Sequence, residues 1–370
     1  MKIRLPRQDF QDALSAIATL TGGRTTRPIL SCVKLKASGD LLELAATDGE
    51  ASLRINVPAL SNEKKGQAVV GTDRLLGIVR EMSDVEIALD ADDRHCTIRG
   101  AGSEFRIFVQ SAADFPPVPE FTDEADLVVD GVELRRMISL TIYAAARETS
   151  RFAINGVLWE KQGKKLFMVA TDGRRLARAG SGVRESRAGD FQAIVPAKAL
   201  SVFERVFAPP RDGREWNIDV KVMPNQVLLR SGDRVLASNL VEGHFPKYQD
   251  VIPRETDKRA TVDRVELHAA IRQAAQLTTE ESRAIRLAFD GARLEITANA
   301  PEQGDARVDL PIEFTGSAME IGFNPNFLND ALRVLTLPKV NIEMTDKTRP
   351  GIICGDDRNE FLYVIMPVSL

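Results

Sequence analysis

The chain has little of what usually marks a metalloprotein, a secreted protein or a membrane protein. Its 370 residues include only three histidines, three cysteines and two tryptophans. No run approaches the roughly 18 apolar residues that a membrane-spanning helix needs. The first ten residues, MKIRLPRQDF, lack the apolar stretch of a signal peptide. We therefore expect a cytoplasmic protein that has no membrane partner.

The few metal-ligand residues are too scattered to predict a site. Cys32, Cys96 and Cys354 are far apart and odd in number, which favours reduced thiols in a core or strand over a disulfide framework. The histidines have no short spacing, so the sequence predicts neither a metal nor a cofactor. The remaining cation candidate, DADD at 90–93, lies between two alternating stretches and predicts the polar tip of a hairpin.

The common catalytic motifs are also missing. The sequence has no phosphate-binding G-x-x-x-x-G-K-[ST], no G-x-G-x-x-G after a strand and no G-x-S-x-G elbow. TDGRR at 171–175 could form an active-site loop, but Asp-Gly is also common in turns. We therefore expect a binding or scaffold protein and not an enzyme.

Composition and charge predict a globular chain of two or three domains. The sequence is 44% hydrophobic and 28% charged, and 49 Lys and Arg against 53 Asp and Glu give a formal charge of −4. This charge argues against a protein that binds nucleic acid through bulk positive charge. The length exceeds that of one ordinary domain.

What the sequence does have is a threefold repeat, and repeats decide architecture. Each copy opens with a strand and a helix whose apolar residues recur at spacings of three and four. These are Phe10, Leu14 and Ile17; Leu134, Ile138 and Ile142; and Leu267, Ile271 and Ala274. Predicted hairpins follow at 33–47, 157–171 and 285–299, and second helices at 71–79, 195–203 and 323–331.

Matching endings and linkers set the predicted boundaries of the copies. The second strands of the hairpins end in LAATDG (44–49), MVATDG (168–173) and ITANAP (296–301). The polar, proline-bearing segments PPVPEFTDEAD and PRETDKR are typical of linkers. We predict an α+β fold of three domains, each with two helices against sheets, at 1–120, 127–253 and 257–370. Three α+β domains without a common function are the alternative.

Five segments in the same order extend this pattern to a family. They are GGRTTRPIL (22–30), SAADFP (111–116), NGVLWE with VATDGRRLA (155–160 and 169–177), EGHFPKYQDVIP (242–253) and YVIMPVSL (363–370). With the repeat, the whole chain resembles the bacterial sliding clamp, the beta subunit of DNA polymerase III. The resemblance implies the DNA-clamp fold and a head-to-tail homodimer ring around double-stranded DNA. The implied role is a processivity factor that tethers the polymerase.

The resemblance also implies partners. They are the catalytic subunit of DNA polymerase III, a clamp loader, and other polymerases and repair proteins with a clamp-binding motif such as Gln-Leu-x-Leu-Phe. The implied pocket for that motif consists of Arg151, Ile154, Thr171, Gly173, Arg174, Arg175, Leu176, Pro246, Val251, Val364, Met366, Pro367, Val368 and Leu370. DNA itself would be held topologically, without sequence preference.

Two further residue sets follow from the resemblance. The DNA-facing positions are Arg24, Arg74, Arg147 and Lys198, and the dimer interface would place Phe105 and Ile107 against Gln276 and Leu277. The sequence departs from the family pattern at some neighbouring positions, which are Glu148, Phe152, Ala153, Asp250, Gln276 and Pro350.

Two alternatives remain beside a replicative clamp. One is a clamp-like paralogue that binds peptides or small molecules outside replication. The other is an enzyme that uses Asp172, Arg174 and Arg175. We expect Asp172 instead to fix the turn that presents Gly173 to Leu176, because an Asp side chain can accept from the backbone two residues on.

Overall fold

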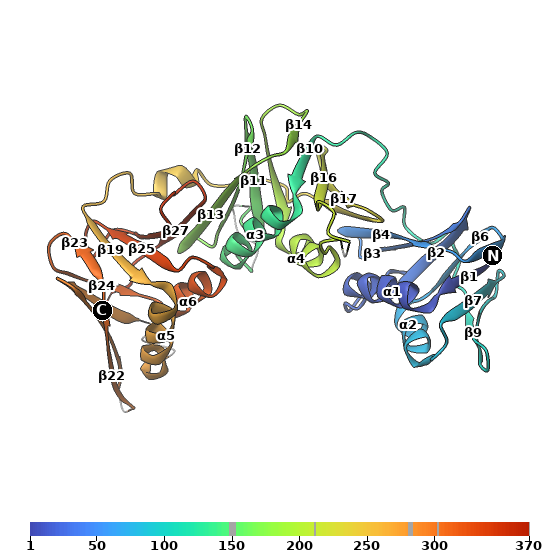
Figure 1. Cartoon of the computed structure of the whole chain (residues 1–370), viewed down its shortest axis with the longest axis horizontal. Coiled ribbons are helices and arrows are strands. Elements are labelled where there is room, and N and C mark those ends of the chain that lie inside the picture. Colours follow the sequence, from blue (N-terminus) through green and yellow to red (C-terminus); the bar gives the residue numbers. More distant parts are fainter. Residues whose placement is uncertain (148–152, 211, 280–283, 302, 370) are drawn as a thin grey trace. The chain divides into compact units, whose positions relative to one another are not determined.

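The computed structural model describes residues 1–147, 153–210, 212–279, 284–301 and 303–369 (Figure 1). The chain divides into two compact units. Unit 1 comprises Met1–Val132, Arg184–Ala188 and Lys198–Leu240, and unit 2 comprises Glu133–Val183, Gly189–Ala197 and Val241–Leu370. Two helices, α3 (Gly131–Thr141) and α4 (Ala197–Val206), run across the bounds of the units in the sequence.

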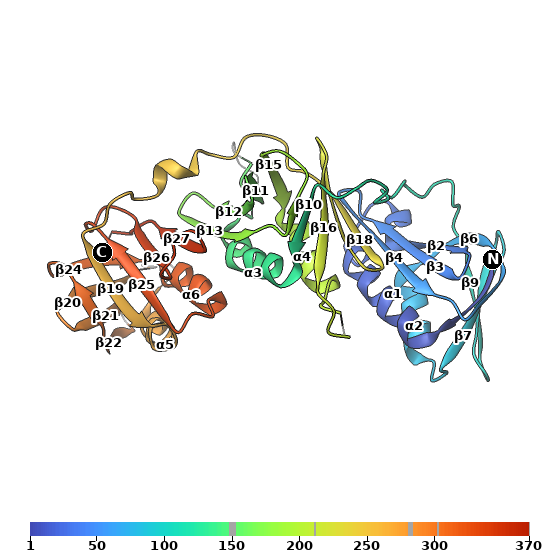
Figure 2. The same ribbon diagram turned by 45° about the horizontal axis from the view of Figure 1, so that its top comes forward.

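Unit 1 contains two antiparallel sheets. The five-stranded sheet has the order β5 (Ser61–Lys64), β1 (Lys2–Pro6), β7 (Glu86–Ala91), β8 (His95–Arg99) and β9 (Glu104–Phe108). The nine-stranded sheet has the order β14 (Glu185–Ser186), β10 (Leu127–Asp130), β16 (Asn217–Val222), β17 (Gln226–Ser231), β18 (Arg234–Asn239), β4 (Ala51–Pro58), β3 (Leu41–Thr47), β2 (Cys32–Ser38) and β6 (Gly66–Gly71). Helix α1 (Arg7–Thr21) packs on β3, β4 and α2 (Thr72–Glu81), as Figure 2 shows.

Unit 2 also contains one nine-stranded antiparallel sheet and one smaller antiparallel sheet. Its nine-stranded sheet has the order β15 (Phe191–Pro196), β11 (Gly156–Gln162), β12 (Lys165–Thr171), β13 (Arg175–Gly182), β27 (Phe361–Ile365), β26 (Gly351–Cys354), β25 (Lys339–Met344), β19 (Lys258–Asp263) and β23 (Glu313–Thr315). The four-stranded sheet has the order β22 (Gly304–Pro311), β21 (Arg293–Ala300), β20 (Ile285–Asp290) and β24 (Met319–Phe323). Helix α5 (Arg264–Ala274) packs on α6 (Pro325–Val334) and on β21 and β22.

One antiparallel strand pair in each nine-stranded sheet joins two of the repeated segments. In unit 1 this pair is β4–β18, and in unit 2 it is β13–β27. In the part of the chain that the structure describes, four short 3-10 turns lie in the connections: η1 (Pro28–Ser31), η2 (Ile142–Ala144), η3 (Tyr248–Val251) and η4 (Ala275–Leu277). A pocket opens at the end of each of these two strand pairs.

The predicted hairpins and helices are confirmed, with small corrections at helix starts. The stripe residues Phe10, Leu14 and Ile17 are fully buried, as an amphipathic helix against a sheet requires. Pro196 ends β15 and does not enter helix α4, whereas Asn324 caps α6 by accepting a hydrogen bond from the Asn326 amide at 2.9 Å. Ile142 lies in η2, beyond the end of α3.

The cysteines and the DADD segment lie where the sequence predicts. All three cysteines are buried and free. The loop after β7 is a polar hairpin tip, in which the Asp92 carboxylate accepts hydrogen bonds from the amides of Arg94 and His95. Within the described ranges, no group of His, Cys, Asp or Glu is arranged to hold a metal ion, and no helix is long and apolar enough to cross a membrane.

Candidate functional site

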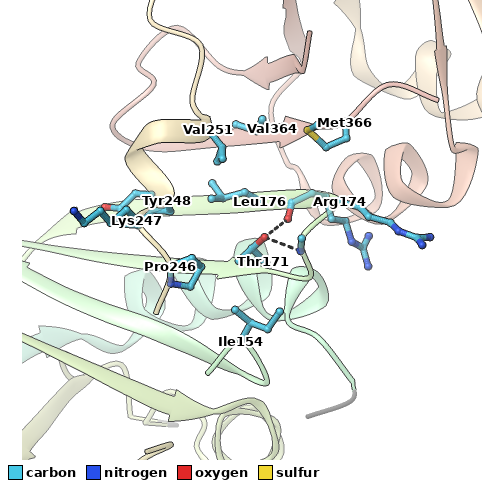
Figure 3. A pocket seen from close by; sticks show the side chains of 12 residues that line it. Ile154, Thr171, Arg174, Leu176, Pro246, Lys247, Tyr248, Val251, Val364 and Met366 are labelled. Carbon is cyan, nitrogen blue, oxygen red and sulfur yellow. Dashed lines mark hydrogen bonds between the residues drawn. The ribbon is translucent and has the colours of Figure 1, made fainter. Parts of the chain in front are cut away.

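An apolar pocket of about 200 Å³ lies in unit 2, where β12, β13 and β27 reach the segment 246–251 (Figure 3). We call it the apolar junction pocket. It is lined by Ile154, Thr171, Gly173, Arg174, Arg175, Leu176, Pro246, Lys247, Tyr248, Val251, Val364 and Met366. All of these except Lys247 and Tyr248 belong to the set predicted from the sequence.

The turn between β12 and β13 forms one wall of the pocket, and Asp172 holds it. The Asp172 carboxylate accepts hydrogen bonds from the amides of Arg174 and Arg175 at 3.0 and 3.1 Å. Thr171 donates its hydroxyl to the Arg175 carbonyl at 2.6 Å and accepts from the Gly173 amide at 3.1 Å. Gly173 has φ +87°, a conformation that suits glycine. The predicted role of Asp172 is confirmed.

The floor of the pocket belongs to the core, and its mouth is open. Leu176 and Val364 are directly opposed in the β13–β27 pair, and each is 2% exposed. Met366 and Val251 stand at the mouth with exposures of 42% and 49% (Figure 3). A ligand can therefore bury the apolar surface of the mouth against a floor that is already rigid.

Tyr248 was not predicted as a lining residue, because nothing in the segment 242–253 indicates which way its ring turns. It lies in η3, and its hydroxyl donates to the buried Glu160 carboxylate at 2.6 Å. Gln192 donates to the other Glu160 oxygen, also at 2.6 Å. Burial and the hydrogen bond to Glu160 raise the pKa of Tyr248. This bond fixes one wall of the apolar junction pocket to the sheet.

The two arginines of the turn differ in what they can offer a ligand. The Arg175 guanidinium donates to Asp172 at 3.0 Å, to Asp330 of α6 at 2.7 Å and to the Tyr143 carbonyl at 2.8 Å. Arg174 is exposed, and no carboxylate of the described chain lies within ion-pair distance of it. Arg174 is therefore the cation that can meet a ligand, while Arg175 ties the turn to α6.

The end of the chain departs from the predicted pocket. The Met366 amide donates to the Arg174 carbonyl at 3.0 Å, which closes the turn, but the Val368 amide donates to Gly322 of β24 at 2.9 Å. Val368 lines a different cavity, and neither it nor Pro367 lines the apolar junction pocket. Arg151 and Leu370 fall outside the described residues.

Comparison with known proteins decides the family. The N-terminal, central and C-terminal domains of the DNA polymerase III beta subunit match residues 1–119, 128–247 and 249–369. The beta sliding clamp of Escherichia coli (strain K12) is 31% identical over 371 residues, which cover 100% of both chains. The chain belongs to the DNA polymerase III beta subunit family.

Solved sliding clamps have the same fold as this beta subunit family member. The crystal structure of the Pseudomonas aeruginosa clamp bound to griselimycin has a TM-score of 0.94 at 30% identity, with 100% of both chains covered. The Bacillus subtilis clamp, at 22% identity, has a TM-score of 0.94 over 100% of this chain and 99% of its own. The predicted DNA-clamp fold is thus confirmed.

The predicted DNA-facing residues of this family member are exposed but unequally available. Arg24 follows α1, Arg74 lies on α2, and Arg147 follows η2. Lys198, on α4, has its ammonium 2.6 Å from Asp48 and 3.7 Å from Glu50. Its charge is therefore largely compensated within unit 1.

The predicted interface residues lie on two separate elements. Phe105 and Ile107 are in β9, an edge strand, and Phe108 beside them is 76% exposed, a feature that the sequence reading missed. Gln276 and Leu277 form part of η4, where Gln276 is exposed. The departures at Asp250 and Pro350 do not reach the apolar junction pocket, and Glu148 lies outside the described residues.

Proposed function

We propose that this chain acts as a sliding clamp, a homodimeric ring that encircles duplex DNA and carries partner proteins on the apolar junction pocket. The three predicted domains, 1–120, 127–253 and 257–370, would form half of the ring. Partners would be the replicative polymerase, the clamp loader, and other polymerases and repair proteins with the short binding motif. The observation that carries this proposal is the apolar junction pocket in a chain that the three domains of the family match at residues 1–119, 128–247 and 249–369.

The chemistry of the pocket suits partners that exchange. Leu176 and Val364 give an apolar floor for anchor side chains such as the Leu and Phe of the motif, and Met366 adapts to anchors of different shape. The exposed Arg174 side chain can bind a polar or acidic group of the same peptide. A small apolar site with few polar contacts gives affinities in the micromolar range, about −8 kcal/mol.

Edge strand β9 supports the proposed ring. It leaves one side of the five-stranded sheet unpaired and displays Phe105 and Phe108. An exposed edge with aromatic residues promotes pairing with another chain unless it is covered. A head-to-tail contact between strand β9 and η4 of a second copy would cover this edge. If the second copy makes the same contact with the first, the dimer is a closed ring.

Retention on DNA tests the encircling function. The clamp loader of the source organism would load the labelled chain onto nicked circular DNA, followed by gel filtration in 0.3 M salt. We expect the chain to elute with circular DNA and to leave it when a restriction enzyme linearises the circle. Equal retention on both forms would contradict topological binding, because a ring slides off a free end.

Peptide binding tests the pocket separately. Met366→Ala and Met223→Ala are matched variants, since the two methionines are 42% and 41% exposed and each donates its amide to a backbone carbonyl. Fully burying a Met side chain contributes about 1.5–3 kcal/mol, so covering the exposed part of Met366 contributes about 0.6–1.3 kcal/mol. We expect Met366→Ala to weaken a fluorescent Gln-Leu-x-Leu-Phe peptide about three- to ninefold.

The control and a truncation complete that experiment. Met223→Ala should leave peptide affinity unchanged while altering stability by a similar amount. Removal of residues 366–370 should abolish binding and leave the dimer intact, as measured by light scattering. Unchanged affinity in both Met366→Ala and the truncated chain would overturn the assignment of the pocket.

A further inference from the structure

The repeat builds a second pocket at the equivalent place in unit 1, and its lining is polar. We call this cavity of about 450 Å³ the polar junction pocket. It lies where β3, β4 and β18 reach the segment 116–119, and its polar lining consists of Arg27, Thr47, Glu50, Ser52, Gln226, Ser238 and Asn239. The corresponding elements in unit 2 are β12, β13 and β27 with the segment 246–251.

The turn at 47–52 repeats the four hydrogen bonds that Thr171 and Asp172 make with the backbone of the turn at 171–176. Thr47 donates to the Ala51 carbonyl at 2.9 Å and accepts from the Gly49 amide at 3.1 Å. The Asp48 carboxylate accepts from the amides of Glu50 and Ala51 at 2.9 and 2.8 Å. Gly49 has φ +95° where Gly173 has φ +87°. The backbone that shapes the apolar junction pocket is therefore present twice.

The strand register extends the match to the lining itself. Ser52 is opposed to Ala237 in the β4–β18 pair, just as Leu176 is opposed to Val364. The Asn239 amide donates to the Glu50 carbonyl at 2.9 Å, and the Met366 amide donates to the Arg174 carbonyl at 3.0 Å. Three apolar lining positions thus have small or polar counterparts: Leu176 and Ser52, Val364 and Ala237, Met366 and Asn239.

These exchanges reverse the chemistry of the pocket. Ser52 and Asn239 offer a hydroxyl and an amide where the other pocket offers a leucine floor and a methionine wall. The Ser52 hydroxyl donates to Thr47 at 2.9 Å, and the Asn239 side chain accepts from the Gln226 amide at 3.0 Å. A polar ligand can use the donors and acceptors that remain, whereas an apolar anchor would shield them from water. Three of the four residues in the wall at 116–119 are prolines, which have no N–H, so Val118 carries the only backbone donor of that segment. The wall is fixed by Arg54, which donates to the carbonyls of Val118 and Pro119 at 2.5 and 3.1 Å.

Arg27 gives the polar junction pocket one contact for an anion. Arg27 is exposed, and among the described residues no carboxylate lies within ion-pair distance of it. Glu50, the acid of the lining, is 3.7 Å from the Lys198 ammonium, which also pairs with Asp48 at 2.6 Å. The lining therefore presents one free cation beside a partly compensated acid.

We propose that the polar junction pocket binds a short extended peptide segment that carries a carboxylate and amide or hydroxyl side chains, with the carboxylate on Arg27 and the polar groups on Ser52, Gln226 and Asn239. The choice of a peptide rests on the proposed function of the apolar junction pocket, whose backbone it shares. The chemistry differs, so the two pockets would select different segments.

Selection from a phage-displayed random heptapeptide library tests this. The target is the full chain with Met366→Ala and Val251→Asp, which disable the apolar junction pocket, and the selected peptides are synthesised with a fluorescent label. Arg27→Gln removes the proposed anion contact. Arg94→Gln is the matched control, because Arg94 is also an exposed arginine of unit 1 but lies at the hairpin tip between β7 and β8.

We expect selected peptides rich in Asp or Glu whose affinity falls about tenfold or more on Arg27→Gln and stays unchanged on Arg94→Gln. Asn239→Met, which installs the counterpart of Met366, should weaken them as well. Failure to enrich any peptide, or peptides that are indifferent to Arg27→Gln and Asn239→Met, would overturn the proposal. A Gln-Leu-x-Leu-Phe peptide on the unmodified chain tests the apolar junction pocket in parallel, so the two failures are distinguishable.

Discussion

Removal of one hydroxyl group should separate the stability of the apolar junction pocket from its binding. In Tyr248→Phe the aromatic ring stays in the pocket, but the buried Glu160 carboxylate loses the donor at 2.6 Å. Both residues are 5% exposed, so water does not readily replace that donor. The second Glu160 oxygen keeps its bond from Gln192. The expected effect is therefore the loss of one charge-assisted hydrogen bond.

The expected magnitude follows from the acceptor. A hydrogen bond to a charged group contributes about 1.5–3 kcal/mol, against about 0.5–1.5 kcal/mol for a neutral one. Tyr363 offers the comparison, because this buried tyrosine donates to the neutral Phe327 carbonyl at 2.9 Å, although the Arg175 guanidinium also contacts its hydroxyl. Tyr248→Phe should thus lower the free energy of unfolding by about 2 kcal/mol, and Tyr363→Phe by about 1 kcal/mol.

The two tryptophans of the chain allow the assay to report one unit at a time. Trp159 lies in unit 2 and Trp216 in unit 1, and both are buried. In a Trp216→Phe background, urea unfolding followed by fluorescence reports only the unit that contains Tyr248. With an m-value of about 2 kcal/mol per molar, Tyr248→Phe should lower the midpoint by roughly 1 M.

The pH dependence and peptide binding supply the refuting results. Because the pKa of Tyr248 is raised by burial and Glu160, its contribution is present below the unfolded value near 10 and is lost as the pH rises above it. The difference in the free energy of unfolding between the unmodified chain and Tyr248→Phe should therefore shrink above pH 10. A stability loss in Tyr248→Phe no larger than that in Tyr363→Phe, or a large loss of peptide affinity, would refute the reasoning.

Three further predictions concern other groups. The pKa of Asp48 is lowered because bonds from backbone amides and Lys198 outweigh the effect of burial, so the cost of Asp48→Asn, followed by Trp216 fluorescence, should fade as the pH drops below about 4. Gly173→Ala should cost about 1–2 kcal/mol in urea unfolding although no atom obstructs the added carbon; a neutral result would contradict the left-handed turn. Burial raises the pKa of Cys96 to about 12 and of Cys354 to about 11, so neither thiol should react with Ellman's reagent at pH 8 until the chain unfolds.

The sequence predicted the hairpins and the pocket turn wherever the three copies of the repeat could be aligned with one another. Alternation and turn residues were enough to place the hairpins, because a one-residue slip would turn every buried side chain to the other face. The pocket set was predictable through the TDG turn, whose Asp and Gly have a local structural requirement that a sequence displays directly. Such local requirements do not depend on which strand lies next to the turn.

What depended on distant partners could not be predicted. From the sequence, Arg175 is expected to be a surface cation. In the structure its guanidinium donates to Asp330, which is 155 residues away in the sequence, and to the Tyr143 carbonyl. Lys198 similarly reads as a DNA-facing cation until Asp48 is placed 2.6 Å from it. The course of the chain beyond Met366 was decided by an open acceptor on β24, the Gly322 carbonyl. None of these partners is near in sequence, so no local sequence pattern predicts them.

The two junction pockets separate what the backbone decides from what the side chains decide. Their turns share the same hydrogen bonds, the same left-handed glycine and the same strand register, so the cavity at each junction follows from the repeat alone. Leucine against valine at the floor of one, and serine against alanine at the floor of the other, then set opposite ligand chemistry. A duplicated fold can therefore keep one pocket apolar while its copy has a polar lining, because the hydrogen bonds that shape both turns come from Thr, Asp and Gly and not from the residues that differ.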